Sequence, residues 1–180
     1  MRVRGVDVPP GEDAPLQSAE TFELLYRSEY ARLVRLAFVL TGSVGAAEEE
    51  VQEAFAVAHR RWRTLQRYER PDLWMRRVVI NRSLSRRRKQ QSAARLASRL
   101  AAEPVPVDEP VLREPDRALW AAVRSLPRRQ QEVLVLVVLD QRSFSEAAEV
   151  LDCAETTART HYRRARLALA AALDPTEVVR

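Results

Sequence analysis

Two charged segments of this sequence have residue types and spacings suited to binding. Residues 46–62 read AAEEEVQEAFAVAHRRW, and residues 143–169 read SFSEAAEVLDCAETTARTHYRRARLAL. The first is an acidic helix followed by an arginine-dense stretch, and it can present carboxylates to a protein partner. The second has the layout of a helix-turn-helix that ends in a basic helix, which can present guanidinium groups to DNA. Together they indicate an adaptor that brings a partner to a DNA sequence.

The same sequence offers no arrangement suited to catalysis or to a metal. Glu48–Glu50 and Glu53 point around a helix, and no His or Cys lies at ligand spacing from them. Cys153 is the only cysteine, which excludes an internal disulfide, and His59 and His161 lie far apart in the sequence. There is no glycine-rich phosphate loop or nucleophile elbow. We therefore expect no catalytic residues, no metal site, no cofactor and no enzyme activity.

Composition indicates a globular protein with a polyanionic partner. The 180 residues are 46% hydrophobic and 31% charged, with a net charge of +5. Residues 60–89 hold twelve basic residues and two acids, a concentration that favours binding to phosphates. The longest apolar run, residues 133–139, is too short to cross a bilayer, and residues 1–20 lack the apolar core of a signal peptide. We expect a soluble, cytoplasmic protein without membrane insertion.

Apolar periodicity predicts an all-α fold with two small helical domains, an N-terminal helical bundle and a C-terminal helix-turn-helix domain. The expected helices span about 22–41, 46–62, 71–89, 117–126, 128–139, 143–151 and 155–173. The expected domain organisation is a flexible extension 1–19, a first domain 20–91, a flexible linker 92–116 with a short helix at 93–102, a second domain 117–174 and a tail 175–180.

One apolar run is ambiguous. Residues 132–139, EVLVLVVL, contain β-branched residues that favour strands. Their helical neighbours and the absence of a strand partner favour a buried helix instead. An exposed patch for a partner is the alternative.

The faces of two helices suggest their partners. In residues 46–62 the inner face is Ala47, Val51, Ala54, Phe55, Ala58 and Trp62, and the outer face is Glu49, Gln52, Glu53 and Ala56. In the last helix the buried stripe is Ala158, Tyr162, Ala165 and Leu169, and the opposite face is Thr156, Arg159, Thr160, Arg163 and Arg164. Such a basic face suits guanine edges and phosphates. The alternative is a solvated face on an ordinary helical hairpin.

The segment between these helices is rich in arginine. Its expected basic arc is Arg76, Arg82, Arg86 and Arg87, and its expected apolar arc is Leu73, Ile80 and Leu84. Asn81 lies beside the apolar arc, where it could hydrogen-bond a loop or read a base. The preceding basic loop 63–70 is flanked by Trp62 and Trp74, a composition that suits single-stranded nucleic acid. A core position for both tryptophans is the favoured alternative.

Across residues 21–90 and 117–173 the chain resembles the extracytoplasmic-function sigma factors, the small two-domain specificity subunits of bacterial RNA polymerase. The resemblance rests on LTG (40–42), AEEEVQEAF (47–55), PDLWMRRVVINRSLSRRR (71–88), LPRRQQEVLVL (126–136) and the helix-turn-helix, in this order and spacing.

The resemblance implies a role for each of these segments. The acidic helix would bind the polymerase clamp through Glu49, Gln52 and Glu53. The melted −10 promoter strand would be held by Trp62, Arg63, Arg76, Asn81, Arg82 and Arg86. The −35 duplex would be read by Arg159, Thr160, Arg163 and Arg164. Expected partners are core RNA polymerase, through its clamp and flap regions, and promoter DNA. An anti-sigma protein is a candidate regulator, because exposed binding faces need masking when the factor is idle.

This sequence departs from the family at several positions. Glu50 stands where leucine is usual, and Asp152 replaces the usual turn glycine, although aspartate tolerates a left-handed backbone better than most residues. Ala147 and Ala158 replace larger aliphatic residues, and Val137 stands where a basic residue is common.

Two rival functions remain open at this stage. A helix-turn-helix regulator of the response-regulator output type would bind operators without polymerase, but the first domain lacks the α/β pattern of a phosphoacceptor domain. A non-specific nucleic-acid-binding protein would use residues 60–89 with steep salt dependence.

Overall fold

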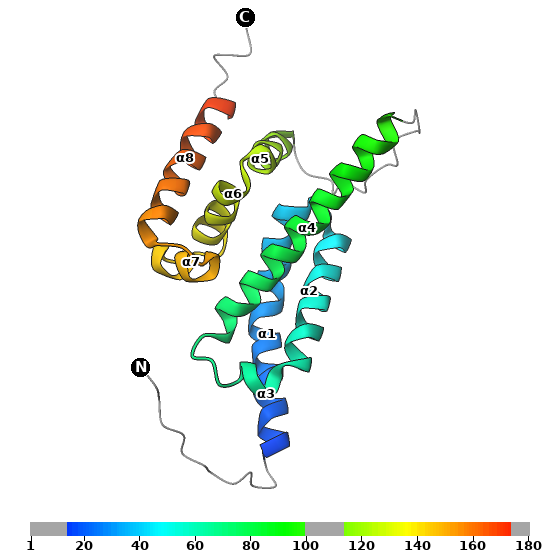
Figure 1. The fold of residues 1–180 in the computed structure, drawn as a ribbon, viewed down its shortest axis with the longest axis vertical. Helices are drawn as coiled ribbons and strands as arrows, with labels where there is room; N and C mark the ends of the chain where they lie inside the picture. Colours follow the sequence, from blue (N-terminus) through cyan, green and yellow to red (C-terminus); the bar gives the residue numbers. More distant parts are fainter. Residues whose placement is uncertain (1–13, 100–113, 174–180) are drawn as a thin grey trace, which may run out of the picture.

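The structure is a computed structural model that describes residues 14–99 and 114–173, with side chains placed for residues 21–93 and 118–173. Every regular element in this part of the chain is helical, so the predicted all-α fold class is confirmed (Figure 1). The elements are α1 (Ala14–Thr41), α2 (Val44–Arg60), α3 (Trp62–Leu65), α4 (Pro71–Arg99), α5 (Glu114–Ser125), α6 (Arg128–Leu134), the π-helical turn η1 (Val135–Leu139), α7 (Phe144–Leu151) and α8 (Glu155–Leu173).

Helices α1–α4 form an N-terminal lobe in which α1, α2 and α4 pack against one another. The Ser43 hydroxyl begins α2 by accepting a hydrogen bond from the Ala46 amide, which satisfies one amide of the first turn. The inner face predicted for residues 46–62 is confirmed, since its five residues in α2 and Trp62, which begins α3, are all buried. Their burial turns the opposite, acidic face of α2 outward.

Four helices extend beyond their predicted ends: α2 begins at Val44, α5 begins at Glu114 inside the predicted linker, and α1 and α4 are longer by several residues. Helix α1 begins at Ala14, inside the expected flexible extension, because proline is tolerated in the first turn and Pro15 lies there. Helix α4 continues to Arg99, because residues 90–99 contain no glycine or proline and several strong helix formers. The expectations for residues 1–13, 100–113 and 174–180 lie outside the described residues. None of the helices in the described part combines the length and apolarity needed to span a bilayer.

The ambiguous apolar run is a helix, as predicted, but only part of it is buried. Residues 133–136 are buried, whereas Val138 is 51% exposed and Leu139 is 42% exposed. The run ends in a π-helical turn, in which the Asp140 amide donates to the Val135 carbonyl at 3.1 Å. Gln141 then adopts a left-handed backbone with φ 56°. This wide turn directs Asp140 toward the N-terminal lobe.

The C-terminal lobe, α5–α8, contains the predicted helix-turn-helix. Ser143 and Glu146 form a capping box at the start of α7, and Ala158 and Ala165 of α8 are buried against the lobe. Asp152 ends α7 with φ 54° and ψ 57°, in the left-handed region. The expectation that aspartate accepts this conformation in place of glycine is confirmed.

The backbone at Asp152 supports a first prediction. Asp152→Gly is expected to be more stable than Asp152→Ala by about 1–2 kcal/mol. In the left-handed region the alanine Cβ lies too close to the following carbonyl oxygen, whereas glycine has no Cβ. Both variants lose the same carboxylate, so the difference between their free energies of unfolding reports the backbone conformation at residue 152. Urea denaturation followed by circular dichroism measures it, and equal stabilities would show that residue 152 is not left-handed in solution.

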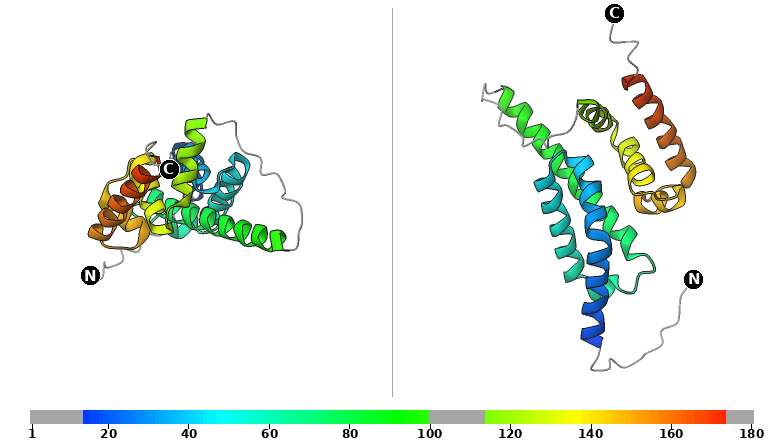
Figure 2. Two further views of the ribbon diagram at one scale, coloured as in Figure 1. Left: turned by 90° about the horizontal axis from the view of Figure 1, so that it is seen from above. Right: turned by 180° about the vertical axis from the view of Figure 1, so that it is seen from behind.

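The two lobes pack against each other. Helix α4 contacts α7, and α1 contacts both η1 and α5, so the C-terminal lobe lies along one side of the N-terminal bundle (Figure 2). The buried apolar residues of both lobes form one continuous cluster. The sequence indicated two lobes and a tether, and the structure adds an interface between the lobes.

Candidate functional site

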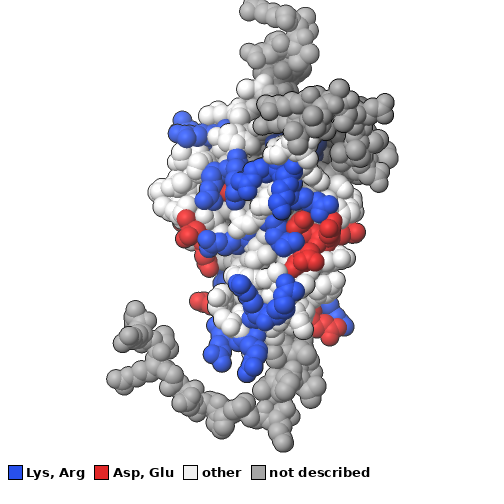
Figure 3. Space-filling view, turned by 45° about the vertical axis from the view of Figure 1, so that its right-hand side comes forward, with Lys and Arg blue, Asp and Glu red and all other residues white. Residues whose placement is uncertain are grey.

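The acidic face of α2 is exposed, as the sequence predicted. Glu49, Gln52 and Glu53 all lie on the surface. Two of them face arginines of α4: Arg86 donates to Glu49 at 2.6 Å, and Arg82 lies 3.9 Å from Glu53. Figure 3 shows a group of acidic side chains directly beside a broad cluster of basic ones. The carboxylate face and the arginines of α4 therefore form one mixed surface.

Glu50, the departure from the family pattern, is buried beneath this surface. It accepts hydrogen bonds from Arg82 at 2.8 Å and from Arg86 at 3.3 Å. Burial alone would lower the pKa of Arg86, but its hydrogen bonds to Glu49 and Glu50 outweigh burial and raise that pKa. A leucine could not make these bonds, so here the contact between α2 and α4 is partly ionic.

The residues expected to hold the −10 strand do not share one environment. Arg63 is exposed, whereas Trp62 is 7% exposed and packs edge-on against Phe22, with ring centroids 5.2 Å apart. Asn81 is exposed and accepts a hydrogen bond from Arg128 of the C-terminal lobe at 2.9 Å. Of the three, only Arg63 and Asn81 are accessible to solvent. The core alternative for Trp62 is confirmed, and the same ring is not available for base stacking in this arrangement.

Arg76 is fully buried, at 0% exposure, so the expected basic arc of α4 is wrong at this residue. Arg76 follows Leu73 by three residues and precedes Ile80 by four, which places it on the apolar side of the helix. It donates to Glu29 of α1 at 2.6 Å and to the Asp72 carbonyl at 2.9 Å. In this arrangement Arg76 cannot reach DNA.

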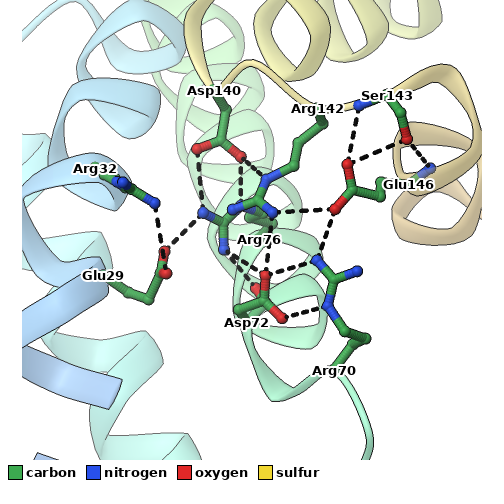
Figure 4. A network of polar contacts seen from close by, with 9 residues as sticks. All are labelled: Glu29, Arg32, Arg70, Asp72, Arg76, Asp140, Arg142, Ser143 and Glu146. Carbon is green, nitrogen blue, oxygen red and sulfur yellow. Dashed lines mark hydrogen bonds and ion pairs between the residues drawn. The ribbon is translucent and has the colours of Figure 1, made fainter. Parts of the chain in front are cut away.

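Arg76 also joins the two lobes. Its guanidinium group binds both carboxylate oxygens of Asp140, which follows η1 and is 3% exposed (Figure 4). Arg142 lies 2.9 Å from Asp140 and 3.3 Å from Asp72 of α4. Arginine forks suit such planar, two-oxygen pairing, so Arg76 and Arg142 each bridge several carboxylates.

Glu146 completes this network. Arg70, just before α4, donates to Glu146 at 2.7 Å and to Asp72 at 3.1 Å. The Arg70 hydrogen bond, followed by the Ser143 amide, lowers the pKa of Glu146 to about 2. Burial would raise the pKa of Asp72, but the Arg70 hydrogen bond and the neighbouring arginines lower it. We call this set the inter-lobe cluster: Arg70, Asp72, Arg76, Asp140, Arg142 and Glu146.

No prediction from the sequence placed Glu29, Asp72, Asp140, Arg142 and Glu146 in a common network. One signal was available. Glu29 lies four residues from both Leu25 and Leu33, so a carboxylate interrupts the apolar stripe of α1. Arg76 interrupts the stripe of α4 in the same way. A charged residue at such a position needs a buried partner of opposite charge.

The expected DNA-reading face of α8 is exposed. Arg159, Thr160, Arg163 and Arg164 lie on the surface, opposite the buried alanines. Arg159 is held in place, because Glu155 accepts from it at 2.6 and 2.9 Å and its guanidinium lies 4.5 Å from the ring centroid of Phe144. This face can offer donors to phosphates and base edges without rearrangement.

These surfaces carry charged groups that can pair with charged partners. Within the described residues, no group of three or more His, Cys, Asp or Glu side chains could hold a metal ion. Most groups with shifted pKa values lie in ion pairs within and between the lobes, whereas burial lowers the pKa of Arg87. The arrangement combines a mixed α2–α4 surface, a basic α8 face and a polar contact between the lobes.

Comparison with known proteins identifies both lobes. The family model described as "Sigma-70 region 2" matches residues 25–93, and the model described as "Sigma-70, region 4" matches residues 116–169. The chain is 30% identical over 157 residues to "ECF RNA polymerase sigma factor SigM" of Mycobacterium tuberculosis, covering 83% of this chain and 75% of that protein. It is 26% identical over 151 residues to "ECF RNA polymerase sigma factor SigW" of Bacillus subtilis, covering 77% and 81%.

Solved structures show the same fold. The sigma factor RpoE of Bartonella quintana, solved with the anti-sigma factor NepR, has a TM-score of 0.65 and 21% identity, covering 88% of this chain and 98% of that one. CnrH, solved with the cytosolic domain of CnrY, has a TM-score of 0.63 and 23% identity, covering 88% and 94%. The two matched regions, the SigM similarity and the shared fold lead to one conclusion: this chain belongs to the ECF sigma factors of RNA polymerase.

Proposed function

We propose that this protein acts in the cytoplasm as a promoter-specificity subunit without catalytic activity of its own. It binds core RNA polymerase through the N-terminal lobe, reads the −35 duplex with α8 and helps open the −10 DNA. The observation that carries the proposal is the separation of two exposed surfaces: carboxylates on α2 and guanidinium groups on α8. Opposite charges on different lobes allow a protein and DNA to be bound at the same time.

The family resemblance suggests a role for each residue, and the exposure of these residues supports it. Glu49, Gln52 and Glu53 contact the polymerase clamp. Arg159, Thr160, Arg163 and Arg164 contact the −35 duplex, and an anti-sigma protein is the candidate that masks these faces.

The −10 strand contacts the N-terminal lobe at its accessible residues Arg63, Asn81, Arg82 and Arg86. Trp62 and Arg76 act indirectly, through the core and the inter-lobe cluster. Capturing unstacked bases on this surface would offset an unstacking cost of a few kcal/mol per step.

Run-off transcription with purified core polymerase on a genomic promoter library tests the proposal. Promoter-specific transcripts that require this protein, together with its co-purification with core, are the expected result. Binding to a palindromic operator as a dimer, with no transcripts, would instead identify a helix-turn-helix regulator that works without polymerase.

Arg163 offers a narrower prediction. Arg163→Ala is expected to weaken −35-dependent initiation by about 1–3 kcal/mol, because an exposed arginine that reads a base edge or phosphate is lost. Run-off transcript yield on matched and mutated −35 sequences measures the effect. Arg27→Ala, which removes an exposed arginine from α1, is the control. An equal loss of transcript yield in both variants on every promoter would show that Arg163 does not contribute to −35 recognition.

A further inference from the structure

A small cavity between α4, α5 and α6 is lined by arginines. Its volume is about 220 Å³, below the roughly 300–1,000 Å³ of pockets that hold drug-sized ligands, so it suits a compact ligand. Among the residues that the structure describes, no aspartate or glutamate lines it. We call it the arginine cavity, after the four arginines in its walls: Arg87, Arg88, Arg124 and Arg128.

Three of these arginines have no carboxylate partner. On α4, every other arginine with a described side chain pairs with a carboxylate: Arg76, Arg77, Arg82 and Arg86. Arg87 and Arg88 pair with none in the described part of the chain, and neither does Arg124 of α5. The arginine cavity therefore concentrates positive charge that these residues leave uncompensated, in contrast to the mixed α2–α4 surface.

The charge of Arg128 is partly offset. Its Nε donates to Glu132 at 2.7 Å, and a terminal nitrogen donates to Asn81 at 2.9 Å. These bonds fix the position of Arg128 in the wall. The net charge of the cavity thus comes from the other three arginines.

Arg87 is held against a second cation. It donates to the side-chain oxygen of Gln131 at 3.1 Å and to the backbone carbonyl of Arg124, and both acceptors are neutral. Burial, followed by the neighbouring charge of Arg124, lowers the pKa of Arg87. An anion in the cavity would offset both effects, because it would supply the opposite charge that this guanidinium group lacks.

Gln131 adds an unpaired donor to the wall of the cavity. It is 1% exposed, and only its amide oxygen can accept from Arg87, which fixes the orientation of the amide. Its Nε2 is buried and has no hydrogen-bond partner among the described residues. Buried polar groups in native structures are paired with protein, water or an ion. A ligand with several acceptor oxygens is the chemical complement of such a wall.

These donors select the chemistry of the ligand. A guanidinium fork matches the paired oxygens of a carboxylate or a phosphate. Three uncompensated charges favour a phosphate or a pyrophosphate over a carboxylate, because the attraction grows with the charge of the anion. Leu84 and Leu126 form apolar parts of the wall, and low-dielectric walls strengthen the attraction.

We propose that the arginine cavity is a binding site for phosphate groups, in which Arg87, Arg88 and Arg124 pair with the oxygens of a compact multivalent anion. This inference does not depend on the proposed function, which assigns no role to these three arginines. The phosphate groups belong either to a free phosphate compound or to a nucleic-acid backbone, and competition between the two distinguishes these sources.

Isothermal titration calorimetry of the full chain with pyrophosphate tests the proposal, at a fixed ionic strength set with sodium chloride. The wild type is expected to bind one equivalent. Arg124→Gln and Arg88→Gln are each expected to weaken binding about tenfold, because each removes charge-assisted hydrogen-bond donors. Neither side chain bonds to the described residues, so both variants should fold, and circular dichroism checks that they do.

Lys89→Gln is the matched control. Lys89 is next to Arg88 on α4, is exposed and does not line the cavity. Because it removes the same unit charge, this variant should keep the wild-type affinity if pyrophosphate occupies the cavity. A diffuse positive field would instead weaken binding equally in all three variants. That result, or heats that never saturate, overturns the proposal.

Thermal melts give a second readout. Pyrophosphate at a concentration that saturates the wild type is expected to raise the Tm of the wild type and of Lys89→Gln, because a ligand that binds only the folded protein stabilises it. Arg124→Gln should show a much smaller rise at the same concentration. Equal rises in Arg124→Gln and Lys89→Gln contradict the proposed site.

Competition identifies the source of the phosphate groups once one-to-one binding of pyrophosphate is established. If a short oligothymidylate displaces pyrophosphate from the wild type, the cavity accepts a nucleic-acid backbone. If the oligothymidylate leaves pyrophosphate bound, the cavity takes free phosphate compounds alone. Either result supports the site and assigns its ligand.

Discussion

Arg76→Met is expected to lower the free energy of unfolding by about 3–5 kcal/mol, because it breaks a buried ion-pair network from the centre. Arg76 is fully buried, and the side chains of its partners Glu29 and Asp140 are 9% and 3% exposed. Without the guanidinium group, these carboxylates and Asp72 lose their shared cation. Equilibrium unfolding in urea, followed by circular dichroism, measures the change.

Arg76→Lys is the control for charge. An ammonium group keeps the positive charge but cannot pair with several carboxylates through a planar fork, so an intermediate loss is expected. If the only role of Arg76 were to contact DNA, the substitution would leave the free energy of unfolding unchanged and would reduce only promoter opening. A Met variant within about 1 kcal/mol of the wild type would therefore reject the structural role of Arg76.

Trp62→Ala is expected to destabilise the protein by about 3–5 kcal/mol, the usual loss when a large buried ring is truncated. Trp62 is 7% exposed and packs edge-on against Phe22 at 5.2 Å. The cavity would open between α1 and α3, at the base of the α2–α4 surface. Thermal and urea unfolding of the full chain measure the loss.

Trp62→Phe separates packing from base stacking. Phenylalanine keeps an apolar ring in the core, so stability should fall by less than in the alanine variant. If the ring served only to stack on unpaired bases, alanine would leave the unfolding curve unchanged and only promoter opening would suffer. That outcome would contradict the core position of Trp62.

Local pattern was sufficient for most of the fold. The inner face predicted for residues 46–62 repeats at helical spacing from Ala47 to Trp62, and its burial follows from the hydrophobic effect without knowledge of the partner helices. The turn between α7 and α8 was equally local. Asp152 adopts the left-handed backbone that this turn requires.

Helix ends were harder to predict, because a helix continues until something stops it. Helix α4 passes the expected end near residue 89 and reaches Arg99 in the absence of a breaker. The exposure of the last residues of the apolar run 132–139 also depends on how a helix ends. Val138 and Leu139 belong to a π-helical turn, and the wider turn rotates them away from the core.

Residue patterns were enough to predict the helices, their two groups and the outward faces of α2 and α8, because these depend on neighbours in the chain. The order and spacing of the motifs were enough to recognise the family. The directions of the α4 arginines, by contrast, depend on the folded chain. Arg76 meets Glu29, 47 residues away, and Asp140, 64 residues away. Whether a guanidinium group faces DNA or a carboxylate depends on what the fold brings beside it, and no local spacing contains that information.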